Sequence, residues 1–140
     1  MPNYNKMKSQ IFSIAAILLI LISACNTQPK EEKLDLKAKV LEVHDQVMPK
    51  MKDLRVVQKQ LLVLADSSAD SLKAVKYQQL ANDLKLANES MMDWMRSFDP
   101  NFSGTEEEVQ KYLNEQLKDI EEVKKDMLES LEKGQSAVNQ

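Results

Sequence analysis

The sequence contains 140 residues, with 19 basic and 22 acidic side chains, a formal net charge of −3, two glycines, one cysteine and one histidine. Gly-rich phosphate loops, dinucleotide-binding fingerprints and nucleophile elbows are excluded, because each needs several glycines at fixed spacing beside a strand. A single cysteine excludes an internal disulfide, a CxxC redox pair and a Cys/His zinc finger. The abundance of Leu, Lys, Glu, Met, Gln and Ala favours helices.

Residues 1–24 have the pattern of a signal peptide. Two lysines precede an apolar run over 11–22, which is too short to span a bilayer but typical of a signal-peptide core. The chain continues with ISAC at 22–25, which resembles the bacterial lipobox, where the Cys is acylated and becomes the mature N-terminus. The resemblance implies a diacylglyceryl group and an N-acyl chain on Cys25, enough for stable anchoring in a bilayer. An uncleaved anchor with an incidental cysteine is the alternative.

Cleavage before Cys25 removes two lysines and no acids, so the mature chain has a formal charge of −5. This charge argues against nucleic acid and anionic headgroups as partners. Residues 25–33 are expected to be the lipidated Cys and a polar tether. Its acids loosely resemble the export signals of surface lipoproteins in Bacteroidota, although a solvated linker is the simpler interpretation. We expect a lipid anchor in the outer membrane, on either its periplasmic or its surface face.

Apolar residues at helical spacing from Val40 to Ala65 predict the first helix. Pro49 interrupts it, because a proline inside a helix lacks an amide donor and clashes with the preceding turn. We expect either a kink or a new helix that opens with Pro49. The capping residues at 66–70 predict a turn, and one continuous helix through them is the alternative.

Steps of three and four residues between Tyr77 and Phe98 predict the second helix, which ends before Pro100. Thr105 followed three residues later by Glu108 predicts a capping box that opens the third helix.

Gly134 is expected to end the third helix, which leaves 134–140 as a C-terminal tail. Three helices joined by short connections predict an all-α fold, an antiparallel three-helix bundle (up-down-up) in a single domain at 34–133. The alternative is an extended hairpin that completes its core by dimerising.

Candidate functional residues lie in two stretches, HDQVMPKM at 44–51 and SMMDWM at 90–95. If the first two helices fold back on each other, His44 comes opposite Met91. Thioethers and an imidazole together suit a soft monovalent ion such as Cu(I) or Ag(I). The candidate ligands are His44, Met48, Met51, Met91, Met92 and Met95. Trp94 and Tyr112 are expected at the same end, as packing or partner-binding residues.

Ordinary packing is a simpler interpretation of the same side chains. Methionine is an adaptable core filler, and a lone histidine on an apolar face usually makes a hydrogen bond, here to Asp93 or Tyr112. A third interpretation is a Met-rich groove that accepts a partner helix.

The motifs at 44–51 and 90–95, with YLNEQ at 112–116 and DMLESLEK at 126–133, resemble small Bacteroidota lipoproteins of unassigned function that are often labelled "viral A-type inclusion protein". The resemblance covers most of 36–133. It implies an envelope location and a helical domain. The family has no established activity, so no catalytic residue is implied.

Enzyme classes find little support in the sequence. Leu41 stands where a Glu-x-x-His metal motif would need a carboxylate. Lipidation leaves no cysteine nucleophile, and a triad built on His44 lacks a turn-borne serine. We therefore predict a non-enzymatic lipoprotein with a helical binding or structural module, which contacts the bilayer through Cys25 and an envelope protein through its bundle. Soft-metal binding and a partner-helix groove are the alternatives.

Overall fold

The computed structural model describes residues 28–140, with side chains from residue 34 onward. The predicted signal peptide and lipobox therefore lie outside the described residues. The chain divides into two compact units, 1–32 and 33–140. The described residues contain four helices and no strand: α2 (Gln28–Val47), α3 (Lys50–Ser67), α4 (Ser71–Ser97) and α5 (Glu106–Val138).

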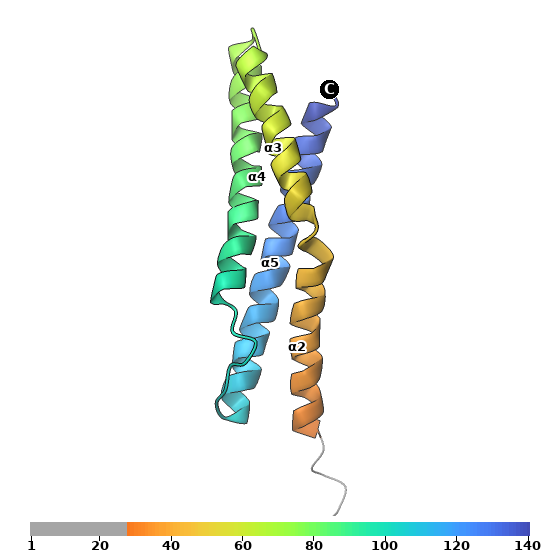
Figure 1. Cartoon of the computed structure of the whole chain (residues 1–140), viewed down its shortest axis with the longest axis vertical. Helices are drawn as coiled ribbons and strands as arrows, with labels where there is room; N and C mark the ends of the chain where they lie inside the picture. Colours follow the sequence, from red (N-terminus) through yellow and green to blue (C-terminus); the bar gives the residue numbers. More distant parts are fainter. Residues whose placement is uncertain (1–27) are drawn as a thin grey trace, which may run out of the picture. The chain divides into compact units, whose positions relative to one another are not determined.

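Within 33–140 the helices form an antiparallel bundle with three arms (Figure 1). One arm consists of α2 followed by α3, α4 returns beside α3, and α5 runs back in the direction of the first arm. The closest backbone approaches join α3, α4 and α5, whereas α2 is held mainly by its side chains. The predicted all-α, up-down-up bundle is confirmed.

The first arm is broken at Pro49, and its second half restarts as a separate helix. The amide of Met48 still donates to the carbonyl of His44 at 2.8 Å, and the amide of Met51 turns to the carbonyl of Met48 at 3.2 Å. Pro49 itself has φ −61° and ψ −24° and stands at the N-cap of α3. Because its ring fixes φ and removes the amide, proline suits a helix start better than a helix interior.

The predicted connections are confirmed. The α3–α4 turn follows Ser67, and Oδ1 of Asp70 accepts the amide of Leu72 at 2.9 Å, which caps α4. Before α5, the amide of Thr105 donates to Oε2 of Glu108 at 2.7 Å and the amide of Glu108 donates to Oγ1 of Thr105 at 3.3 Å. This is the reciprocal capping box that the sequence indicates.

The predicted tether at 25–33 is too long. α2 already begins at Gln28, so residues 28–33 are helical. Pro29 falls in the first helical turn, where an absent amide leaves no intrahelical bond unmade. A proline in a polar segment is as well suited to open a helix as to interrupt one.

The predicted helix end at Gly134 is wrong. α5 continues to Val138, and Ala137 is buried, so 134–138 belong to the bundle rather than to a tail. A Cβ on Gly134 would lie 2.8 Å from Cγ1 of Val57 and 2.9 Å from Cδ1 of Leu84. The missing side chain therefore lets α5 approach α3 and α4 closely.

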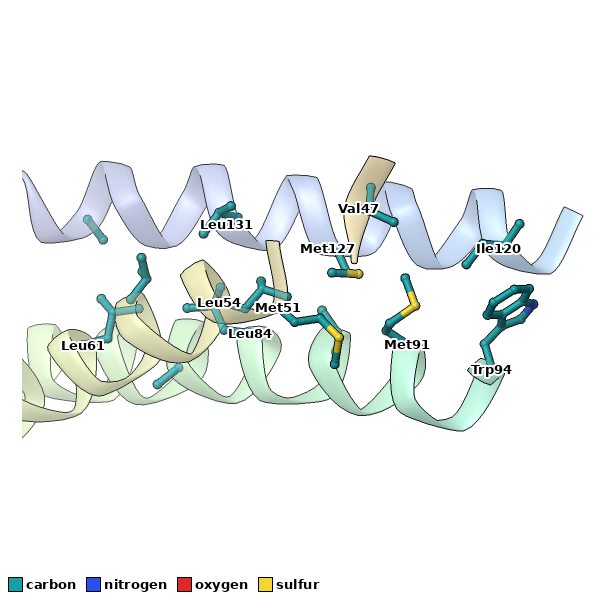
Figure 2. Close-up of a cluster of buried hydrophobic side chains, with 14 of the residues drawn as sticks. Val47, Met51, Leu54, Leu61, Leu84, Met91, Trp94, Ile120, Met127 and Leu131 are labelled. Carbon is teal, nitrogen blue, oxygen red and sulfur yellow. The ribbon is translucent and has the colours of Figure 1, made fainter. Parts of the chain in front are cut away.

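An apolar core runs between the three arms (Figure 2). Its largest fully buried side chains are Leu54, Leu61, Leu84, Met91, Ile120, Met127, Val40 and Val47. Within residues 28–140, none of the helices combines the length and hydrophobicity that a membrane crossing requires.

Candidate functional site

Five rings form a continuous row near the junction of α4 and α5. The ring centroids of His44 and Trp94 are 5.6 Å apart, with planes tilted by 30°. Trp94 stacks on Phe98 at 4.9 Å, Phe98 on Tyr112 at 6.3 Å, and Tyr112 on Phe102 at 4.2 Å. Such offset contacts stabilise packing beyond simple burial. The structure thus brings His44, Trp94 and Tyr112 to one end of the bundle, as predicted.

The end of α4 fixes this row in place. Because Pro100 disfavours a helical residue before it, the backbone leaves the helix and the amide of Asp99 donates to the Tyr112 hydroxyl at 2.7 Å. The ammonium group of Lys37 donates to the carbonyl of Pro100 at 2.6 Å. The loop that starts at Pro100 and Asp99 therefore contacts both Tyr112 of α5 and Lys37 of α2.

The prediction that His44 forms a hydrogen bond with Asp93 or Tyr112 is wrong. Nδ1 of His44 lies 2.9 Å from Oδ1 of its neighbour Asp45. Asp93 pairs with Arg96, and Tyr112 is engaged by Asp99. Since the Asp45 carboxylate is an acceptor, Nδ1 carries the proton and the lone pair of neutral His44 is on Nε2.

The candidate methionines separate into two groups. Met51 and Met91 are core residues with 6% and 0% exposure. In Figure 2, Met51 lies beside Leu54 and Leu84, a step farther along the core from Trp94 than Met91. Met48 and Met92 are 46% and 39% exposed, and Met95 is partly buried against the edge of the core.

Met51 is buried and Met48 is exposed because the break at Pro49 separates them. Met51 belongs to α3, which packs closely on α4, whereas Met48 follows the last turn of α2. Helical spacing across residues 44–51 places the two with His44 only if the helix is unbroken. The break itself was foreseeable from Pro49, but its effect on side-chain direction was not.

Three buried polar atoms in the described part of the chain lack a hydrogen-bond partner: Nε1 of Trp94, Oδ1 of Asn88 and Oε1 of Gln116. The indole nitrogen lies on the edge of Trp94 that is turned away from Met91 (Figure 2). Sequence reasoning identified Trp94 but gave no signal for the two amides, because neither stands in a recognisable motif.

Shallow grooves flank the C-terminal half of α5. One of about 240 Å³ lies against α4, between residues such as Ala87 and Ser130. Another of about 500 Å³ lies against α3 and is lined by residues that include Val56 and Val138. Their linings mix charged, amide and apolar side chains, and neither groove includes His44 or the candidate methionines.

No group of three or more His, Cys, Asp or Glu side chains within residues 28–140 is arranged to hold a metal ion. Comparison of the chain with protein-family models, curated proteins and solved structures finds no match. The resemblance to small Bacteroidota lipoproteins therefore stays a prediction.

Proposed function

We propose that this chain is a lipid-anchored lipoprotein of the bacterial cell envelope, placed in the outer membrane, whose helical bundle binds a partner protein. The anchor is proposed from the lipobox-like run at 22–25, which contains the chain's single cysteine. Acylation of Cys25 with a diacylglyceryl group and an N-acyl chain gives more buried hydrocarbon than stable membrane attachment requires.

The observation that supports partner binding is the exposure of three apolar side chains in the parts of α3 and α4 nearest to the turn that joins them. Leu72 is 81% exposed, Val63 is 66% exposed and Val75 is 51% exposed. Leu72 and Val75 are three residues apart and therefore share a face of α4. Leu72 and Val75 thus form an exposed apolar strip on α4, and exposed apolar surface of this kind is typical of interaction sites because its contact with water is unfavourable.

The α3–α4 turn and the α4–α5 loop lie at opposite ends of α4 (Figure 1), and the ring row lies beside the α4–α5 loop. Within 33–140, the N-terminal part of α2 is at the ring-row end, because Lys37 bonds the carbonyl of Pro100 in the α4–α5 loop. The α3–α4 turn therefore lies at the end of the unit 33–140 that is farthest from residue 33, where the chain enters this unit. A tethered bundle of this kind presents its free end to a partner in the envelope.

The test is site-specific photo-crosslinking in intact cells of the source organism, with the full chain. We expect a crosslinker at position 72 to give one discrete protein adduct, and Val75→Asp to abolish that adduct without loss of helicity. A crosslinker at Glu121, an exposed position on α5, is the matched control. Equal adducts from both positions, or an adduct that survives Val75→Asp, would refute binding at the turn.

A further inference from the structure

We propose that an outward-facing apolar strip on α2 pairs with the same strip of a second copy of this chain, with the two α2 helices parallel. The strip, which we call the α2 strip, consists of Leu34, Ala38, Leu41 and Met48. Leu34 is 63% exposed, Leu41 is 38% exposed and Met48 is 46% exposed. This pairing is a different contact from the partner site proposed near the α3–α4 turn and does not depend on it.

The α2 strip follows the axis of the helix. Leu34, Leu41 and Met48 are seven residues apart, and seven residues complete nearly two helical turns, with a drift of about 20°. The amide of Met48 donates to the carbonyl of His44 at 2.8 Å, so the last helical turn reaches Met48. Ala38, which is exposed, lies on the same face between the two leucines. In heptad terms the large side chains take d positions and Ala38 an a position, which is the seam of a two-stranded coiled coil.

The α2 strip lies on the side of α2 that faces away from the bundle. Val40 and Val47 are buried in the core, and at 100° per residue their positions are roughly opposite the strip. On one flank of the helix His44 contacts Trp94 of α4, and on the other Gln46 accepts from a lysine of α5 at 2.6 Å. The strip occupies the remaining side, so within residues 34–140 it is open to solvent.

The charges along the two edges of the α2 strip identify its partner. Lys37, followed by His44, borders one edge at the g positions of the heptad, and Asp35 and Glu42 border the other edge at the e positions. In a parallel pair the g edge of each helix faces the e edge of the other, so Lys37 of each copy faces Glu42 of the second copy. In an antiparallel pair each edge meets its own counterpart, which sets carboxylates against carboxylates. The charge pattern therefore selects a second copy in parallel orientation.

The anchor proposed at Cys25 agrees with this orientation. Two copies held in one membrane extend their α2 helices away from the same surface, which makes the helices parallel. The charges select the parallel orientation whether or not Cys25 is acylated. The strip spans residues 34–48, roughly 21 Å of helix at 1.5 Å per residue, so the interface is short and its formation depends on protein concentration.

Asp45 interrupts the α2 strip at its second a position. Its carboxylate lies 2.9 Å from Nδ1 of the neighbouring His44, and in the pair it meets the same carboxylate of the second copy. A polar residue at a single a position fixes the register of a coiled coil but lowers its stability. Asp45→Asn keeps a polar group and removes the repulsion, so it should strengthen the pair.

The test is disulfide crosslinking of the purified full chain in detergent micelles. All variants carry Cys25→Ser, so that an introduced cysteine is the single thiol. We expect Leu34→Cys and Leu41→Cys each to form a disulfide-linked dimer on mild oxidation. Equivalent d residues adjoin across a parallel pair, and a disulfide needs Cα atoms within about 7 Å. Asn114→Cys, at an exposed position on α5, is the control and should stay monomeric.

A second substitution tests whether the α2 strip itself forms the contact. Leu41→Glu should lower the crosslinked fraction of Leu34→Cys by roughly tenfold, because it places a charge in the apolar seam. Leu128→Glu is the matched control, since Leu128 is 40% exposed on α5, close to the 38% of Leu41. It should leave the crosslinked fraction unchanged. Circular dichroism verifies that both variants are folded.

A charge exchange tests the orientation. Lys37→Glu should weaken crosslinking at Leu34→Cys, and adding Glu42→Lys should restore it, because the double variant again sets opposite charges across a parallel pair. Lys37 also donates to the carbonyl of Pro100, and the double variant does not recover that bond. Rescue therefore reports on the contact between copies and not on the fold of one copy.

Three results would overturn the proposal. The first is crosslinking of Leu34→Cys no greater than that of Asn114→Cys, and the second is equal loss with Leu128→Glu and Leu41→Glu. The third is a disulfide that joins Leu34→Cys to Met48→Cys chains but not two Leu34→Cys chains, because it would show an antiparallel pair. Since every variant lacks the Cys25 thiol, these outcomes are independent of whether the native chain is acylated.

Discussion

The imidazole of His44 lies 5.6 Å from the indole of Trp94, and through this contact α2 is attached to the middle helix of the bundle. Trp94 is 6% exposed and also stacks on Phe98 at 4.9 Å. The backbone of α2 does not approach its neighbours as closely as the other helices approach one another. The stability of α2 therefore depends on a small number of large side chains.

Replacing that indole should weaken α2 more than the rest of the bundle. We expect Trp94→Ala to lower the free energy of unfolding by about 3 to 5 kcal/mol, the usual cost of deleting a buried aromatic side chain. Hydrogen exchange should show the largest loss of protection over residues 40–47. An even loss over α2 and α5 would contradict the role assigned to Trp94, and Trp94→Phe, which keeps a ring, should lose less.

Gly134 should tolerate no large side chain. An added Cβ would meet Val57 and Leu84 at 2.8 and 2.9 Å, so Gly134→Leu should lower the free energy of unfolding by roughly 1 to 3 kcal/mol or more through overpacking. In Gly134→Ala the same clash is opposed by a gain in helix propensity of about 1 kcal/mol. We expect a small net loss for alanine. Urea unfolding measures both, and Gln135→Ala on the exposed face is the control.

The capping box of α5 should contribute measurably to stability. Thr105→Ala removes the hydroxyl that accepts the Glu108 amide, and loss of such a cap costs roughly 1 kcal/mol. Thr105→Ser keeps the hydroxyl and should retain nearly all of the stability. Equal urea midpoints for the alanine and serine variants would show that the cap contributes nothing.

The same capping box predicts a specific pH dependence. The Thr105 amide, and secondarily the Thr105 side chain, hold the pKa of Glu108 below its ordinary value of 4.5. A carboxyl whose pKa is lowered by folding stabilises the folded state above the unfolded pKa, and that contribution is lost as the pH falls through the lower folded pKa.

The stability difference between the native chain and Glu108→Gln should therefore be constant near neutral pH and shrink below about pH 4.5, the ordinary pKa of this carboxyl. Urea unfolding at intervals from neutral pH to pH 3 provides the measurement. A difference that does not change with pH would mean that the carboxylate charge has no part in the cap.

The bundle was predictable because local signals agreed with one another. The cap at Asp70, the proline at residue 100 and the Thr105–Glu108 box each define a boundary through one side chain and its nearest amides, which sequence spacing reveals directly. The apolar spacing between them then requires that the helices pack.

The role of Gly134 and the burial of the candidate methionines depend on tertiary contacts, which sequence spacing does not reveal. Gly134 has the same local appearance as a helix-ending glycine, and only the closeness of Val57 and Leu84 distinguishes the two roles. Met51 and Met95 are equally good soft ligands by residue type, but their burial depends on how α2 and α3 diverge at Pro49. Helical spacing predicts shared faces within one helix and not across a break.

The proposed function depends most on the lipid anchor at Cys25, and intact-mass spectrometry of the native protein isolated from the envelope tests this anchor most directly. We predict a chain that begins at Cys25 and carries there the added mass of a diacylglyceryl group and one N-linked acyl chain. A chain that still begins at Met1, or one with unmodified Cys25, would contradict the proposal that this protein is a lipid-anchored envelope module.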